Sequence, residues 1–224
     1  REEEAPLYLT RMELDVGKRD TRKGLLSPSM FHGAIESSFS GERERRLWRV
    51  DEFQGRYYLL LLSARVPDLS HMVEQFGTEG SERSWQTKAY EPLLERVKPG
   101  SAWQFRLTAN PTKSVRSSQP GKRGEVHAHI TPAHQLQWLL DRCEDHGFTA
   151  DPEEVTVTKS QWQRFYKGGQ QKKPVTLLSV TFEGILTVTD EVRFRKTLVE
   201  GLGRGKAFGL GLLTVIGLRG NAHG

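Results

Sequence analysis

The chain has 224 residues, of which 36% are hydrophobic, and a formal net charge of +5 at pH 7. This apolar content excludes wholesale disorder. The single cysteine, Cys143, excludes a disulfide framework and predicts a reducing, cytoplasmic setting. No apolar run approaches the roughly 18 residues that a membrane-spanning helix needs, so no membrane is expected among the partners. The excess of basic residues favours a polyanionic partner.

The N-terminal half of the sequence predicts one β-α-β-β-α-β unit. In chain order, the predicted elements are a strand over 7–16, a basic loop over 20–25, a helix over 27–39, strands over 45–53 and 56–66, a short helix over 68–76 and a closing strand around 87–95. Ser27 and Pro28 mark the start of the first helix, because serine suits the N-cap and proline the first helical position.

The C-terminal half repeats the pattern. Its predicted elements are a strand over 102–110, a basic loop over 111–125, a helix over 131–147, strands over 153–166 and 174–188, a helix over 190–203 and a last strand over 211–219. The whole chain is therefore interpreted as an α+β protein of two tandem ferredoxin-like (RRM-like) β-α-β-β-α-β domains, which cover residues 6–97 and 100–220.

A glycine-rich segment, GLGRGKAFGLGLL, occupies residues 201–213. It does not fit the Walker A motif, because Glu200 stands at the first glycine position and Ala207 follows Lys206. It does not fit the dinucleotide fingerprint either, since a helix precedes it and a strand follows. Gly201 or Gly203 could cap the preceding helix. Five glycines exceed that need, so the segment is interpreted as a surface where RNA phosphates approach the backbone.

Several segments in chain order resemble the CRISPR repeat-processing endoribonucleases of subtype I-E, the CasE branch of the CRISPR-associated RAMP superfamily. They are YLTRMEL (8–14), FRLTANPTK (105–113), GKR (121–123), QWLLDR (137–142), FEGIL (182–186) and the glycine-rich segment. The resemblance implies tandem ferredoxin-like domains and cleavage of CRISPR repeat RNA at the base of its stem-loop, without metal or other cofactor. It also implies that the protein stays bound to the mature guide RNA, with the other subunits of a type I-E (Cascade) surveillance complex as partners.

Metal-free RNA cleavage uses the 2′-hydroxyl of the RNA as the nucleophile. A base must take its proton, an acid must protonate the leaving 5′-oxygen, and the charged phosphorane must be stabilised. The expected products are a 2′,3′-cyclic phosphate or 3′-phosphate and a 5′-hydroxyl end. Histidine suits the acid or base role because its ordinary pKa is about 6.5.

The resemblance places the catalytic histidine at His32. Helical spacing puts Ser29, His32 and Glu36 on one polar face, opposite Phe31 and Ile35. Glu36 could orient His32 or raise its pKa, or it could be an exposed acid.

Two positions beside His32 depart from the family pattern. Ser29 stands where better-known relatives carry a tyrosine, and Ser37 where some carry a lysine, and both are predicted as catalytic residues together with His32. A serine hydroxyl is a poorer proton donor than a phenol. The partner of His32 is therefore left open among Arg22, Lys23 and a tyrosine from elsewhere. The departures also support the alternative of a catalytically weak or inactive RNA-binding subunit.

Clustered basic residues predict the RNA-binding surface. They are Arg22, Lys23, Arg106, Lys113, Lys122, Arg123, Arg164, Lys167, Lys172, Lys173, Arg204 and Lys206. The hairpin tip around Gly168 and Gly169 is expected to enter the major groove of an RNA stem. Binding should depend strongly on salt. A generic RNA-recognition protein is the third alternative, but the chain lacks an aromatic RNP1-like strand.

Three histidines of the C-terminal half lie close together in the sequence. His127 and His129 would face one side of a strand and His134 follows, so a metal site is conceivable. No cysteine or carboxylate completes the set, and the prediction is that no metal is bound. His71, His146 and His223 are expected at the surface.

Overall fold

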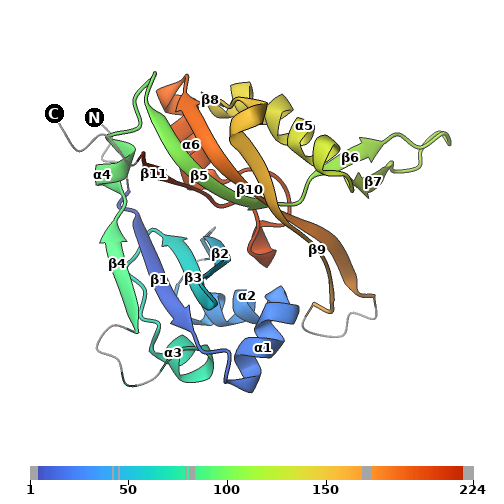
Figure 1. Ribbon diagram of the computed structural model, residues 1–224. Coiled ribbons are helices and arrows are strands. Elements are labelled where there is room, and N and C mark those ends of the chain that lie inside the picture. Colours follow the sequence, from blue (N-terminus) through green and yellow to red (C-terminus); the bar gives the residue numbers. More distant parts are fainter. Residues whose placement is uncertain are drawn as a thin grey trace.

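The structure is a computed structural model, which describes residues 5–41, 43, 44, 46–78, 80, 84–167 and 173–218. Two larger antiparallel sheets and their helices follow one another along the chain, and a two-stranded sheet is added in the second half (Figure 1). The N-terminal half contains β1 (Tyr8–Leu14), α1 (Arg19–Leu26), α2 (Pro28–Ser37), β2 (Leu47–Phe53), β3 (Arg56–Ser63), α3 (Ser70–Phe76), β4 (Trp85–Ala89) and α4 (Glu91–Leu94).

The C-terminal half begins at β5. It contains β5 (Ala102–Ala109), β6 (Thr112–Val115), β7 (Glu125–Ala128), α5 (Pro132–Cys143), β8 (Phe148–Thr149), β9 (Val155–Phe165), β10 (Val175–Val188), α6 (Glu191–Glu200) and β11 (Leu213–Gly217), with 3₁₀ turns η1 (Glu144–His146), η2 (Pro152–Glu154) and η3 (Lys206–Phe208). None of the helices in this described part of the chain is long and apolar enough to span a membrane.

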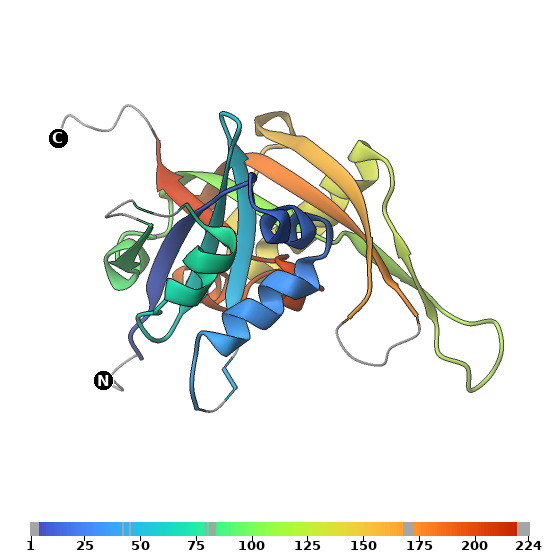
Figure 2. The same cartoon turned by 90° about the horizontal axis from the view of Figure 1, so that it is seen from below.

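The first sheet has the strand order β2-β3-β1-β4, and every pair is antiparallel. Alternation along β1 points Met12 and Leu14 to one face, where they pack against Phe31 of α2 and Phe76 of α3. Seen from below, the helices of this half lie across the sheet (Figure 2). The helix that carries His32 is therefore anchored by a buried aromatic residue next to the histidine itself.

The second sheet has the order β11-β5-β10-β8, and β9 also pairs with β10. Trp138 and Leu139 of α5 and Phe194 of α6 fill its core. The same apolar cluster includes Leu47 and Leu62 of the first sheet, so the two halves share part of one core. Burial raises the pKa of the Cys143 thiol to about 12, and the thiol is therefore an inert core group.

The predicted basic loop over 20–25 is wrong, because these residues belong to α1. The helix buries Thr21, whose Oγ1 donates a hydrogen bond to the Phe76 carbonyl at 2.9 Å. A Cβ at Gly24 would lie 2.6 Å from the Phe31 ring, so glycine permits close packing of α1 on α2. Tertiary packing thus forms a helix that its glycine and its charged residues do not predict.

Two further segments differ from the sequence prediction. The basic loop over 111–125 is largely a hairpin, in which β6 and β7 pair from Thr112↔Ala128 to Val115↔Glu125. The closing strand predicted around 87–95 ends at Ala89, because Pro92 cannot donate to a sheet and lies instead in the first turn of α4. The other predicted strands and helices are confirmed, with shifted ends.

Candidate functional site

His32 lies half-buried on α2, directly after Phe31, which is 1% exposed. Glu36, one turn further along, does not bond to it. The Glu36 carboxylate lies 3.5 Å from Arg46 and 3.8 Å from Arg43, and these two arginines follow the helix. Among the described residues, the His32 imidazole has no hydrogen-bond or ion-pair partner. Within the described part of the chain, the His32 side chain is therefore not engaged in a polar contact.

Ser29 connects α2 to the end of β9. Its Oγ donates a hydrogen bond to the backbone carbonyl of Tyr166 at 3.1 Å and lies 3.2 Å from Ser27 Oγ. The Tyr166 side chain is 57% exposed. The serine hydroxyl therefore links α2 to the C-terminal half and holds the backbone of Tyr166 beside the first turn of α2.

Ser37 lies near the C-terminal end of α2 and is exposed. Its Oγ donates to the Ala34 carbonyl of its own helix at 3.0 Å. Five residues of helix rotate a side chain by about 140°, so Ser37 and His32 lie on different faces of α2. The structure does not bring this predicted residue to the histidine.

The five glycines of the glycine-rich segment all have positive φ values, from +77° at Gly209 to +94° at Gly211. Gly201 ends α6 by donating its N–H to the Thr197 carbonyl at 2.9 Å, which confirms the predicted cap. Gly201, Gly209 and Gly211 are buried. A Cβ at Gly209 would lie 2.8 Å from the Trp48 ring.

The glycines are therefore explained by backbone conformation and by packing against β2. The interpretation of the segment as an RNA-approach surface stays a prediction; Gly201 and Gly211 are buried, whereas Gly209 lines a cavity between the two halves. Two cations of the segment remain accessible: Arg204 is exposed and Lys206 is half-buried.

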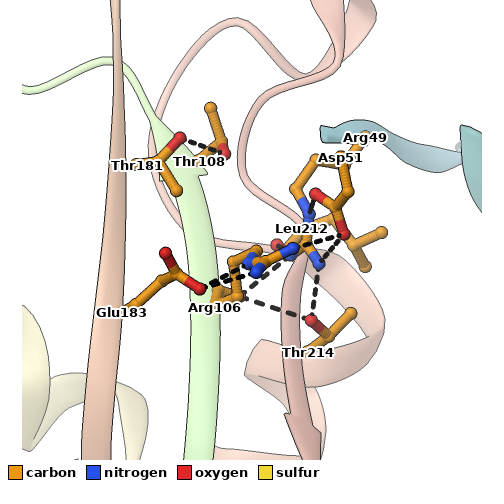
Figure 3. Close-up of polar contacts among 8 residues, drawn as sticks. All are labelled: Arg49, Asp51, Arg106, Thr108, Thr181, Glu183, Leu212 and Thr214. Atoms are coloured by element: carbon orange, nitrogen blue, oxygen red, sulfur yellow. Dashed lines mark hydrogen bonds and ion pairs between the residues drawn. The ribbon is translucent and has the colours of Figure 1, made fainter. Parts of the chain in front are cut away.

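Arg106 lies in a polar cluster that joins the two halves (Figure 3). Its guanidinium binds Glu183 of β10 at 2.7 Å and lies 3.3 Å from Asp51 of β2. Arg49 of β2 is buried beside it and donates to the carbonyls of Arg106 and Leu212, both at 2.9 Å. Its other donors bind the Asp51 carboxylate and Thr214 Oγ1. The charge of Arg106 is thus compensated by Glu183 and Asp51, whereas Arg204 has no ion-pair partner among the described residues.

The β6–β7 hairpin projects from the second sheet as an arm (Figures 1 and 2). Lys113, Lys122 and Arg123 are exposed on it. A groove of about 560 Å³ is lined by Lys122, Arg123 and Arg204. A neighbouring groove of about 470 Å³ is lined by Lys113, Arg204 and His134. The structure therefore brings the predicted cations of this arm together with Arg204.

The β9–β10 hairpin projects on the same side of the molecule as the β6–β7 arm (Figure 2). Arg164, Lys167 and Lys173 are exposed on it, and Lys172 lies outside the described residues. The Lys167 ammonium lies 5.6 Å from the centroid of the Phe208 ring of η3. This hairpin therefore reaches the glycine-rich segment as well as α2.

Helix α1 carries the remaining two predicted cations. Arg22 donates to the carbonyls of Val16 and Gly17, at 2.8 and 2.7 Å, and Lys23 is exposed. Arg22 also lines a cavity of about 570 Å³ between the two halves, together with Lys159 of β9. Lys159 was missed in the sequence, although alternation along the strand over 153–166 puts Lys159, Gln161 and Gln163 on one face.

The predicted cluster of His127, His129 and His134 is only partly brought together. No group of three or more potential metal ligands occurs among the described residues. The rings of His129 and His134 are 6.1 Å apart, and Thr131 Oγ1 lies 2.9 Å from His134 Nδ1. Burial lowers the pKa of His129, and the nearby charges of His134 and Lys113 lower it further.

His146 is half-buried, so its predicted surface position is wrong. Its Nδ1 lies 3.1 Å from Thr197 Oγ1 of α6, and burial lowers its pKa. His71 is exposed as predicted, and His223 lies outside the described residues.

Comparison with known proteins assigns the chain to a family. Residues 7–216 match the family described as "CRISPR associated protein". The CRISPR-associated endoribonuclease Cse3 of Thermus thermophilus is 33% identical over 222 residues, which cover 93% of this chain and 99% of Cse3. The chain therefore belongs to this family of CRISPR-associated proteins.

Two further comparisons concern a second relative and solved structures. The Cascade subunit CasE of Escherichia coli K12 is 30% identical over 70% of this chain and 73% of its own length. The structure of Cse3 bound to a 19 nt RNA has a TM-score of 0.76 at 32% identity and covers 94% of this chain and 99% of that one. Thermus thermophilus Cse3 bound to an RNA representing a pre-cleavage complex has a TM-score of 0.77 at 30% identity, with the same coverage.

Proposed function

We propose that the protein is an endoribonuclease that cleaves CRISPR repeat RNA at the base of its stem-loop and remains bound to the mature guide RNA. The observation that carries this proposal is the likeness, over nearly the full length of both chains, to Cse3 in complex with RNA. The exposed cations of the two hairpins support it, because positive charge suits a nucleic-acid backbone.

The finer architecture of this proposal is a pair of tandem ferredoxin-like domains over residues 6–97 and 100–220. The strand orders β2-β3-β1-β4 and β11-β5-β10 with β9 support it, because both follow from a β-α-β-β-α-β chain whose first and third strands pair centrally. The β6–β7 arm and α1 are then additions to this common plan.

In the proposed reaction, His32 acts as general acid or base at the scissile phosphate. A base removes the proton of the RNA 2′-hydroxyl, and its oxygen attacks the adjacent phosphorus. The 5′-oxygen leaves and takes a proton from the acid. This gives a 2′,3′-cyclic phosphate or the derived 3′-phosphate and a 5′-hydroxyl end without metal. Arg22 and Lys159, which line the cavity beside α2, are suited to offset the phosphorane charge.

The phenol missing at position 29 is proposed to come from Tyr166. Ser29 Oγ donates a hydrogen bond to the backbone carbonyl of Tyr166. The serine therefore does not act as the proton donor itself, but binds a residue whose side chain is a phenol. His32 lies one helical turn from Ser29.

The test is incubation of the protein with a repeat hairpin in EDTA, followed by analysis of the RNA ends. A 5′-hydroxyl product is expected, and the variant His32→Ala should abolish it. Undiminished cleavage by His32→Ala would remove His32 from the reaction. Tight binding by the unmodified protein without cutting would instead support the alternative, an inactive RNA-binding subunit, which the engaged Ser29 hydroxyl favours. In either role, we propose action in the cytoplasm within a type I-E (Cascade) complex.

A further inference from the structure

Two neighbouring grooves at the base of the β6–β7 arm share Ser114 and Arg204 in their linings. The groove nearer α5 has a volume of about 470 Å³ and is lined by His129, which follows β7, and His134, which lies in the first turn of α5. The His129 N–H donates to the Pro111 carbonyl at 3.0 Å, which holds the arm beside the start of α5 (Figure 1). The arm, α5 and the glycine-rich segment therefore form this groove together.

The two histidine rings in the groove face each other. Their centroids are 6.1 Å apart, and Thr131 Oγ1 lies 2.9 Å from His134 Nδ1. The cap of α5 thus engages one nitrogen of His134 and leaves the other, Nε2, for a ligand. A third histidine, His127, lies 3.2 Å from the Glu125 carboxylate instead. Within the described part of the chain, neither His129 nor His134 has such an ion pair.

The charge of the groove is predominantly positive. Lys113 of β6, Arg142 of α5 and Arg204 line it, against one carboxylate, that of Asp141. In the parts of the chain that the structure describes, none of these three cations forms an ion pair. Trp138, the one large apolar residue of the lining, is 3% exposed and lies under the Arg142 guanidinium at 4.3 Å. The groove therefore suits an anion rather than an apolar partner.

The same surroundings act on the protonation of His129. Burial lowers its pKa most. Among the groups that face it, charges on three elements act in the same direction and one acid opposes them: His134, Lys113 and Arg142 lower the pKa, and Asp141 raises it. The free protein therefore holds His129 neutral at pH 7. An anion beside the ring would favour its charged form.

We propose that this groove binds a phosphate of the RNA backbone and that His129 and His134 take up protons when it does, so that RNA is held more tightly as the pH falls. The proposal rests on the proposed function and adds a pH-dependent phosphate subsite to it. Lysine and arginine stay charged throughout, whereas an imidazole gains its charge only near a pKa of about 6.5. The adjoining groove, which Lys122 and Arg123 line, continues the path of the RNA backbone.

The experiment measures binding of a repeat hairpin with a 2′-deoxy nucleotide at the cut, which cannot be cleaved, in phosphate-free buffers of constant ionic strength. The range from about pH 8 to about pH 5.5 brackets the ordinary histidine pKa. Affinity should rise by up to about tenfold across it for each histidine whose pKa rises by one unit on binding. The double variant His129→Gln, His134→Gln should lose most of this rise.

His71→Gln is the matched control, because His71 is exposed on α3 and lies outside the groove. If the double variant has a lowered melting temperature, His129→Gln alone is used, since it keeps the contact between His134 and Thr131. A neutral methylphosphonate at one position of the RNA should remove the same pH dependence from the unmodified protein.

Three results are distinguishable. Loss of the pH dependence both in the double variant and with one methylphosphonate supports the subsite. If unmodified RNA is bound and cut but the double variant keeps the full pH dependence, or no methylphosphonate position affects it, the subsite is refuted and the proposed function stands. If unmodified RNA is neither bound nor cut, both proposals are wrong.

Discussion

Replacing Gly209 by alanine should destabilise the protein through two separable effects. The φ of +77° at this residue is unfavourable for any residue with a Cβ, which costs about 1 kcal/mol. The added Cβ would also lie 2.8 Å from Trp48 Cζ3 and 2.9 Å from Cη2, in a ring that is 2% exposed. Overpacking of this kind costs about 1–3 kcal/mol. The expected total is therefore about 3 kcal/mol.

Gly100→Ala provides the matched control. Gly100 has a φ of +83°, and a Cβ there would meet no atom within 4 Å. The free energy of unfolding of this variant should fall only by the conformational cost, about 1 kcal/mol. Urea unfolding of both variants measures the difference, and Gly209→Ala should also lower the melting temperature by about 6–12 °C. Equal losses in the two variants would show that contact with Trp48 does not explain the glycine at 209.

Four further outcomes are expected. Tyr166→Phe should slow single-turnover cleavage at least tenfold with little change in RNA affinity; an unchanged rate would remove the phenol from the reaction. Arg106→Ala should destabilise the protein by about 2 kcal/mol in urea unfolding, because Glu183 loses its ion-pair partner while Asp51 keeps only Arg49, and should leave the salt dependence of RNA binding unchanged. Replacing Lys122 and Arg204 together by alanine should reduce the slope of log affinity against log salt by about 2, and no change would exclude the arm groove from RNA binding. The depressed pKa of His146 means that the unfolded chain takes up its proton first as the pH falls. The stability that neutral His146 contributes is therefore fully present above about pH 6.5 and is lost as the pH falls through the folded-state pKa. As the pH is lowered through this range, the melting temperature of His146→Gln should fall less than that of the unmodified protein.

The elements that the sequence predicts well are those whose burial alternates or repeats regularly. Residues 7–16 alternate because one face of β1 is buried under α2 and α3. Helix α5 begins at Thr131 and Pro132, as its capping residues indicate, and the Thr131 side chain accepts a hydrogen bond from the His134 N–H. The alternation of a half-buried strand and the capping residues of a helix are local features, so they can be read directly from the sequence.

Helix α1 and the β6–β7 arm depend on contacts that no local pattern contains. The glycine at 24 weakens a helix on its own, yet it is the residue that lets α1 approach Phe31. The arm exposes nearly all its side chains, so it has no apolar alternation to reveal its strands.

For the candidate site, sequence resemblance indicates His32 and the basic segments, but spacing cannot tell which cations are already paired. Arg106 has the same residue type as Arg204. Only the fold shows that Glu183 and Asp51 compensate the charge of Arg106, while Arg204 stays exposed. The cavity between the halves is lined by residues as far apart in the sequence as 22, 48, 163 and 209, so spacing alone cannot reveal it.

The buried guanidinium of Arg49 has a consequence for how the chain unfolds. Two of its acceptors are main-chain carbonyls of the other half, at Arg106 and Leu212. If the halves separated, a desolvated charge would lose these acceptors while Leu47 and Leu62 lost their apolar cover. Melting of one half alone is therefore unfavourable, and the protein should behave as a single cooperative unit with one unfolding transition. Neither half should be obtainable as an independently stable fragment.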